Sequence, residues 1–235
     1  MPIDAVPDHV AVAVPSIAAA GRRWRDELGG AWCSPPHSDG SGFATRQVWY
    51  HGGAKLELLE PEDDDGFAAG FLQRFGARVH HLTLKVPALR PAVETICAAG
   101  YDVVDVDTSL DVWHEAFLRP SQVGGIIVQV AWSPLSEWDW AALFGTEPEP
   151  VPSTGPQLLG PTLFHPDLDA CARIWTVLGG DVDRDDEVVR VAWGSAPLDV
   201  EVRRGEPTDP VLRVADGPEL VADPALGPAT VSVRR

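Results

Sequence analysis

The fold is decided by residues 8–15, Asp-His-Val-Ala-Val-Ala-Val-Pro, and by residues 80–87, His-His-Leu-Thr-Leu-Lys-Val-Pro, which repeat the pattern 72 positions later. Both segments alternate, are rich in β-forming residues and contain Val-Pro at the end, so each is predicted to be a strand. A helical pattern follows each strand and stops at Gly29 in the first copy and at Gly100 in the second. We expect the second helix to begin at Pro87, as an N1 proline.

Three further strands are predicted after each helix, because short β-rich runs alternate there with turn residues. In the two copies they span residues 31–33, 43–50 and 55–59, and residues 103–107, 113–118 and 126–131. The unit β-α-β-β-β is therefore predicted twice, as modules at residues 6–61 and 78–132 of a domain that spans residues 1–145.

A third and weaker copy is expected in residues 158–235, after a proline-rich linker at residues 146–157. Asp167 is predicted to cap its helix, and Gly160 stands where the first two copies carry histidine. The predicted fold class is α+β, with paired βαβββ modules and a degenerate third module that packs against them.

The charge and composition of the chain argue against several classes of function. The formal net charge of −17 argues against binding to nucleic acid or to an anionic membrane, since both need clustered lysine and arginine. No apolar run reaches the length of about 20 residues that a bilayer helix needs, and the first residues do not form a secretion signal. The three cysteines are scattered and show no metal-binding spacing. We expect a cytoplasmic protein.

Four polar residues occupy matching places in the predicted strands. His9 and His81 open the first strand of each copy, and Glu57 and Gln129 lie in the last strand, 48 positions after each histidine. A carboxylate among apolar strand residues is costly to bury unless it is paired or binds a metal. Two imidazoles and two oxygen donors suit one divalent transition ion, and the choice among Co, Ni, Mn, Zn and Fe stays open. Since side chains alternate along a strand, His80 is expected on the opposite face.

Several segments of residues 6–132 resemble the vicinal oxygen chelate (glyoxalase-like) superfamily, and within it the methylmalonyl-CoA epimerases. The segments that carry the resemblance are Lys-Leu-Glu-Leu-Leu-Glu-Pro (55–61), Ala-Gly-Phe-Leu-Gln (69–73), His-His-Leu (80–82), Phe-Leu-Arg-Pro (117–120) and Gly-Gly-Ile-Ile-Val-Gln-Val (124–130). The resemblance implies a cup built from the paired modules, with a metal ion bound in it.

The resemblance implies that His9, Glu57, His81 and Gln129 are the metal ligands. In the epimerases of the family, the first half supplies glutamine and the second half supplies the glutamate that is implicated in proton transfer. In this sequence the amide and the carboxylate are exchanged, because Glu57 lies in the first half and Gln129 in the second. The candidate base is therefore Glu57.

A second, non-ligand glutamate of the family would fall at Ser41 and Gly42, so it is missing from the first half. If the site is mirrored, its replacement is expected in the second half, where His114 and Glu115 are the candidates. A lysine that the family carries farther along is replaced by Ser121, which weakens the case for a bound CoA phosphate.

The predicted function is a divalent-metal-dependent isomerase, epimerase or lyase that removes an α-proton from a small carbonyl or thioester substrate. Trp49 and Trp113 are candidates for a substrate-stacking surface, and Arg119 is one candidate for pairing with a substrate carboxylate. Two alternatives stay open, namely a non-catalytic ligand-sequestering protein and an extradiol-type dioxygenase. The expected partner is a small molecule, and a homodimer is also left open.

Overall fold

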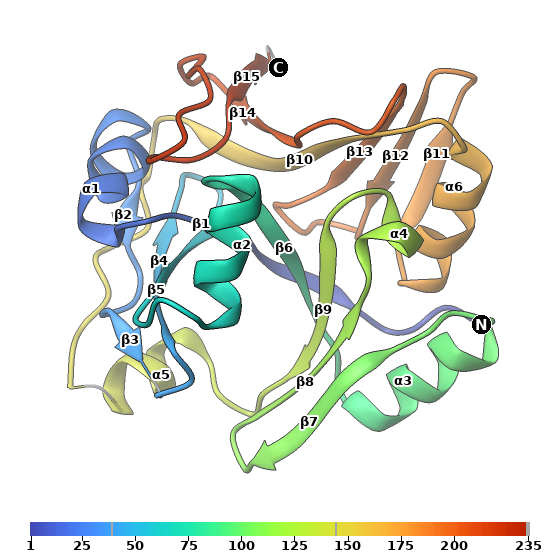
Figure 1. Ribbon diagram of the computed structural model, residues 1–235, viewed down its shortest axis with the longest axis horizontal. Helices are drawn as coiled ribbons and strands as arrows, with labels where there is room; N and C mark the ends of the chain where they lie inside the picture. Colours follow the sequence, from blue (N-terminus) through green and yellow to red (C-terminus); the bar gives the residue numbers. More distant parts are fainter. Residues whose placement is uncertain (39, 144, 234–235) are drawn as a thin grey trace. The chain divides into compact units, whose positions relative to one another are not determined.

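The structure is a computed structural model that describes residues 1–38, 40–143 and 145–233 (Figure 1). The chain forms two compact units. One unit consists of residues 1–9, 81–134 and 160–210, and the other of residues 10–80, 135–159 and 211–235. The fold is mixed α+β with two sheets, as predicted. Among the described helices, none has the length and apolar character required to cross a membrane.

The first module follows the predicted order of a strand, a helical segment and further strands. Ser16 caps the helical segment by accepting a hydrogen bond from the Ala19 amide. The single helix expected here is a short α-helix that continues as a π-helix. The elements are β1 (Val6–Ala13), α1 (Ile17–Gly21), η1 (Arg22–Glu27), β2 (Ala31–Trp32), β3 (His37–Ser38), β4 (Phe43–Trp49) and β5 (Lys55–Pro61), followed by α2 (Phe67–Phe75).

The second module repeats this order, and α3 contacts β8 and β9 (Figure 1). The helix expected to start at Pro87 begins at Leu89 instead. Pro91 then falls in the first helical turn, where a missing N–H costs no intrahelical hydrogen bond. The elements are β6 (Arg78–Lys85), α3 (Leu89–Ala98), β7 (Val104–Leu110), β8 (Trp113–Leu118), α4 (Pro120–Val123) and β9 (Ile127–Trp132), followed by α5 (Glu137–Leu143).

The third module is complete, and two further strands follow it. Asp167 caps the helix as predicted, because its side chain accepts a hydrogen bond from the Ala170 amide. The elements of the third module are β10 (Gln157–His165), α6 (Leu168–Val177), β11 (Asp181–Arg184), β12 (Val188–Ala192) and β13 (Val200–Arg204); β14 (Val211–Ala215) and β15 (Thr230–Val233) come after it. The predicted domain boundaries stay a prediction.

The two sheets repeat one order of strands. The nine-stranded sheet runs β2-β4-β5-β1-β6-β9-β8-β7, with β3 paired to β4, and the six-stranded sheet runs β11-β12-β13-β10-β14-β15. The first strand of a module pairs in parallel with the last strand in β6–β9 and β10–β13, and β14 pairs with β15 in the same way. We therefore interpret β14 and β15 as the first and last strands of a fourth module that is reduced to two strands.

Strand register shows that the third module carries no histidine at the position of His81. Thr83 pairs with Gln129 in the second module, and Thr162 pairs with Glu201 in the third. Gly160 therefore takes the place of His81, as the sequence predicted. It has a φ of +125°, and a Cβ added to it would lie 2.0 Å from the carbonyl oxygen of Asp199. No imidazole fits at this position.

Replacement of Gly160 by alanine is expected to lower the free energy of unfolding by about 3 kcal/mol, because the added methyl overlaps the backbone and the φ is strained. Urea unfolding measures this loss. The matched control is Gly70→Ala in α2, where nothing lies within 4 Å of the added Cβ, and there the stability stays equal or rises by up to about 1 kcal/mol. A Gly160→Ala variant as stable as the wild type would contradict this packing.

Candidate metal centre

Strand pairing sorts the two adjacent histidines of β6 onto different faces. His81 and Thr83 pair with Ile127 and Gln129, so these four side chains share one face of the β6–β9 pair. His80 points to the other face, where its ring packs against Phe67 and Phe71. Burial there lowers the pKa of His80 to about 4. The predicted division between the two histidines therefore holds.

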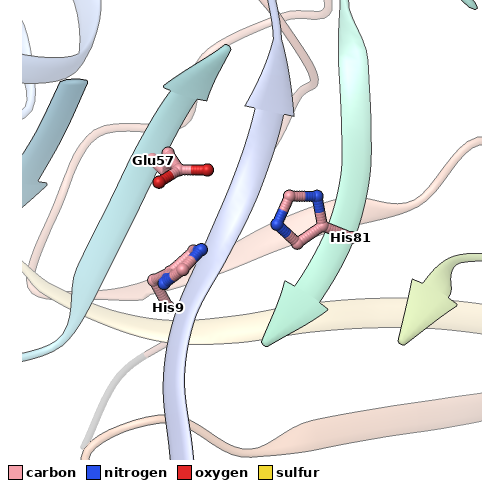
Figure 2. A group of neighbouring side chains, drawn as sticks. All are labelled: His9, Glu57 and His81. Carbon is pink, nitrogen blue, oxygen red and sulfur yellow. The ribbon is translucent and has the colours of Figure 1, made fainter. Parts of the chain in front are cut away.

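Three of the four predicted metal ligands form one cluster. A ligand atom from each of His9, Glu57 and His81 lies within 4.8 Å of the other two (Figure 2). The three residues are 2%, 9% and 5% exposed, and the ring centroids of the histidines are 5.6 Å apart. Two imidazoles and one carboxylate in a buried position are a donor set that fits a divalent transition ion. The described residues can therefore hold a metal ion here.

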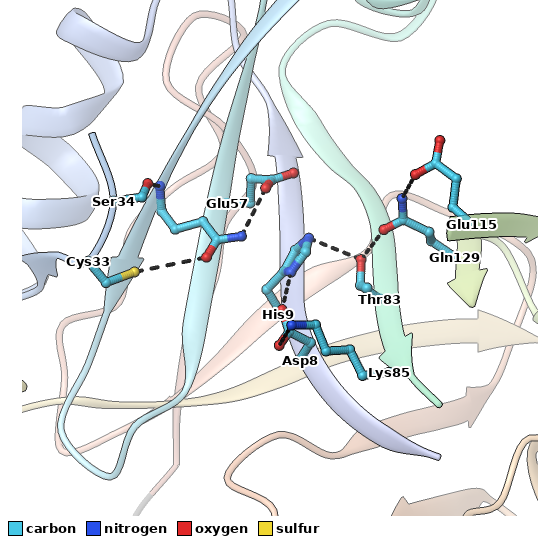
Figure 3. A network of polar contacts seen from close by, with 10 residues as sticks. Asp8, His9, Cys33, Ser34, Glu57, Thr83, Lys85, Glu115 and Gln129 are labelled. Atoms are coloured by element: carbon cyan, nitrogen blue, oxygen red, sulfur yellow. Dashed lines mark hydrogen bonds and ion pairs between the residues drawn. The ribbon is translucent and has the colours of Figure 1, made fainter. Parts of the chain in front are cut away.

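Asp8 orients the ring of His9. Its Oδ2 lies 2.7 Å from His9 Nδ1, and its Oδ1 forms an ion pair with Lys85 Nζ at 3.6 Å (Figure 3). A histidine that ligates a metal commonly gives its second ring nitrogen to a carboxylate, which fixes the tautomer. With Nδ1 held by Asp8, Nε2 is the atom of His9 that would bind a metal. Sequence reasoning missed Asp8, although it directly precedes the predicted ligand.

Gln129, the fourth predicted ligand, lies in a chain of hydrogen bonds (Figure 3). Its Oε1 accepts a hydrogen bond of 2.5 Å from the Thr83 hydroxyl, and its Nε2 donates one of 2.7 Å to Glu115 Oε2. Trp113 Nε1 donates to the same oxygen of Glu115 at 2.7 Å. The Glu115 carboxylate is therefore held beside Gln129 by two N–H donors.

Glu57 has an equivalent support in the first module. Gln47 pairs with Glu57 across the β4–β5 hairpin and donates from Nε2 to Glu57 Oε2 at 3.0 Å. The Cys33 thiol lies 4.0 Å from Gln47 Oε1, in a weak hydrogen bond that orients the amide. Each module thus pairs one amide with one carboxylate, and the two groups exchange strands between the modules. Gln47 was not predicted, because its role depends on the residue that it pairs with across the hairpin.

The structure separates the two candidates for the mirrored acid/base. Glu115 shares a face with Phe117, which pairs with Gln129, whereas His114 pairs with Trp132 and points to the other face. The His114 ring packs on the ring of Trp132 at a centroid distance of 4.6 Å. The geometry therefore favours Glu115 and does not bring His114 together with Gln129.

The predicted substrate-binding residues lie in three different settings. Trp113 bonds to Glu115, and the Lys85 ammonium lies 5.7 Å from its ring centroid. Trp49 is buried in a cluster with Ala31 and Cys33, so core packing accounts for it. Arg119 is exposed and precedes α4 at its N-cap position. Trp113 is thus hydrogen-bonded to a residue of the candidate site, Glu115.

Comparisons with known proteins identify a superfamily that this chain is similar to. Residues 8–117 match the family model of the Glyoxalase/Bleomycin resistance protein/Dioxygenase superfamily. This part of the chain is similar to that superfamily, which is the vicinal oxygen chelate group that the sequence resembles.

The curated relatives are epimerases by name. The mitochondrial methylmalonyl-CoA epimerase of Bos taurus is 29% identical over 126 residues, which cover 52% of this chain and 71% of that protein. The ethylmalonyl-CoA/methylmalonyl-CoA epimerase of Cereibacter sphaeroides is 28% identical over 127 residues, which cover 52% of this chain and 94% of that protein. These matches cover about half of the present chain.

Solved structures show similar folds. A methylmalonyl-CoA epimerase from Mycobacterium tuberculosis has a TM-score of 0.50 at 22% identity, and the match covers 55% of this chain and 89% of that one. A hypothetical protein from Staphylococcus aureus has a TM-score of 0.69 at 11% identity, and the match covers 98% of this chain and 100% of that one. The second likeness shows that the fold of nearly the whole chain, including the six-stranded sheet, occurs in another protein.

The buried ring of His80 gives the metal-free protein a pH-dependent stability. Its pKa is lowered from 6.5 to about 4 in the folded chain, so between these values the unfolded chain binds a proton that the folded chain does not. We expect the free energy of unfolding to fall by up to about 3 kcal/mol as the pH drops from 6.5 to 4. Urea unfolding with chelator present measures this slope, and His80→Leu is expected to flatten it. An equally steep slope in the variant would show that other groups cause it.

Proposed function

We propose that this chain is a metal-dependent epimerase of the vicinal oxygen chelate type, acting on a small α-branched carbonyl acid or thioester. The observation that carries the proposal is the buried cluster of His9, Glu57 and His81. It lies within residues 8–117, which match the superfamily model, and about half of the chain is similar to named epimerases. The names of these relatives make a malonyl-type thioester the first substrate class to test.

The ligand set of the proposed site comprises His9, Glu57, His81 and Gln129. A divalent ion bound there would attract the negative charge that develops on the substrate carbonyl oxygen when the α-proton leaves. Most residues of β1, β5, β6 and β9 around the site are buried, and the low local dielectric would strengthen this electrostatic effect. The chain itself supplies orientation through Asp8, which holds His9, and Gln47, which holds Glu57.

Epimerisation needs an acid and a base on opposite sides of the reacting carbon, and we propose Glu57 and Glu115 for these two roles. Both are carboxylates on the nine-stranded sheet, and each accepts a hydrogen bond from a neighbouring glutamine. Glu57 also belongs to the candidate metal cluster, so as a base it would remove the substrate proton that lies nearest the ion. Glu115 is outside the ligand set, which suits a group that returns the proton to the other face.

The first test is metal content. We expect purified protein to bind about one divalent ion per chain, and His81→Ala to lose it, because a ligand to the ion is removed. Elemental analysis after dialysis measures both. Glu201→Gln is the matched control, since Glu201 has the equivalent strand position in the third module but pairs with Arg203. A folded wild type that binds no metal would instead favour a ligand-sequestering protein.

The second test follows the two proton transfers separately. In D2O, Glu57→Gln and Glu115→Gln are each expected to slow epimerisation of a 2-methylmalonyl thioester by at least about 100-fold. Each variant should still exchange the α-proton of one enantiomer, because one of the two bases survives. Metal content is measured alongside to separate lost binding from lost proton transfer. His114→Ala is the control, and its epimerisation rate should stay within about twofold of the wild-type rate. A large loss of rate in His114→Ala, with the rate of Glu115→Gln unchanged, would assign the proton-transfer role to His114 instead of Glu115.

A further inference from the structure

Lys85 brings a positive charge to the face of the sheet that carries the candidate site. It is the last residue of β6, and its side chain points to the same face as that of His81, because alternate residues of a strand share a face. The Lys85 side chain is 25% exposed. The other lysine of the chain, Lys55, is buried. A partly exposed ammonium on this face is therefore an unusual feature in a chain with a net charge of −17.

Strand register puts Lys85 and Glu115 in one row across the sheet. Both pair with Ala131 of β9, Lys85 from β6 and Glu115 from β8. Because neighbouring strands lie about 4.8 Å apart, the two side chains rise from one face about 10 Å from each other, with a single methyl group between them. The next row of this face holds Thr83 and Gln129. Lys85 is therefore placed across one small residue from the carboxylate that we propose as an acid or base.

The indole of Trp113 contacts both of these charged groups. Its Nε1 donates a hydrogen bond of 2.7 Å to Glu115 Oε2, and the Lys85 ammonium lies 5.7 Å from its ring centroid. A cation near an aromatic face is attracted by the negative charge of the ring face. One side chain thus fixes where the ammonium and the carboxylate lie relative to each other.

The contact between Lys85 and Asp8 leaves the ammonium able to bind an anion. Lys85 Nζ lies 3.6 Å from Asp8 Oδ1 (Figure 3). This distance is longer than the roughly 2.7–2.9 Å of a charge-assisted hydrogen bond. An ammonium has three N–H donors, and this loose ion pair engages one of them at most. Lys85 can therefore accept an anionic group while Asp8 stays beside His9.

We propose that Lys85 binds the free carboxylate of the substrate and so selects anionic substrates. A malonyl-type thioester carries this carboxylate on the carbon that loses its proton, so a carboxylate held at Lys85 places that carbon beside Glu115. The net charge of the chain repels anions in general, and an ammonium at the site offsets this repulsion locally. This inference rests on the proposed function and narrows its substrate class to thioesters with a carboxylate on the reacting carbon.

The test compares two substrates that differ only in this group, a 2-methylmalonyl thioester and the methyl ester of its carboxylate. In metal-loaded protein, Lys85→Met is expected to lower kcat/KM for the acid by about 30-fold, because a charge-assisted contact to the substrate is lost. The value for the methyl ester should fall by less than about threefold, since the ester offers no charge to Lys85. Each substrate is compared with itself in wild type and variant, so the different acidities of the two α-protons cancel.

Binding without turnover gives a second measurement. A 2,2-dimethylmalonyl thioester has no α-proton and cannot react, so titration calorimetry measures its dissociation constant directly. We expect this constant to rise by about 30-fold in Lys85→Met.

Three further variants make the result specific. Lys85→Arg keeps the positive charge and should retain at least about a fifth of kcat/KM for the acid. Arg90→Met removes one positive charge from an exposed position of α3 in the same module, and both substrates should stay within about twofold of wild type. Lys85→Gln replaces Lys85→Met if the methionine variant does not fold. Metal content is measured in every variant, because Lys85 contacts Asp8, which holds His9.

The outcomes separate this inference from the proposed function. Equal losses on the acid and the ester in Lys85→Met, or an unchanged dissociation constant for the 2,2-dimethylmalonyl thioester, overturn the carboxylate-binding role and leave the proposed epimerase in place. A wild-type protein that epimerises neither substrate overturns the proposed function and the role of Lys85 together.

Discussion

Parallel pairing between the first and the last strand of a module is the constraint on which the site depends. In the second module it puts Thr83 opposite Gln129 and therefore sets His81 and the amide on the same face. A slip of one residue would turn His81 away and bring His80 in. The same parallel pairing recurs in β10–β13 and β14–β15.

Within this strand pairing, the chemistry of the candidate metal centre depends on which strand carries each oxygen donor. Glu57 and Gln129 occupy last strands, while Gln47 and Glu115 lie on the strands beside them. Exchanging amide and carboxylate between the halves keeps the charge of the set constant. It also keeps each carboxylate hydrogen-bonded, which a buried carboxylate requires. A mirrored arrangement of this kind is compatible with the same reaction on the same scaffold.

The sequence was sufficient for the order of strands and helices and for the clustering of His9, Glu57 and His81, because both follow from a spacing that recurs along the chain. Whether these residues bind a metal stays a prediction. Cap residues such as Asp167 and the loss of histidine at Gly160 were predicted for the same reason. The supporting residues Asp8, Gln47 and Thr83 were not, since their roles arise from contacts across strands whose register no local pattern specifies. The π-helical continuation of α1 and the two-stranded fourth module were missed because each departs from the repeat that guided the prediction.

The backbone contact at Gly160 has a consequence for protein engineering. A mutation that reintroduced histidine there would collide with the Asp199 carbonyl before it could bind anything. An imidazole at this position would need the backbone ahead of β13 to move first. Engineering a metal site into the third module would therefore have to begin with the segment that carries Asp199 rather than with residue 160.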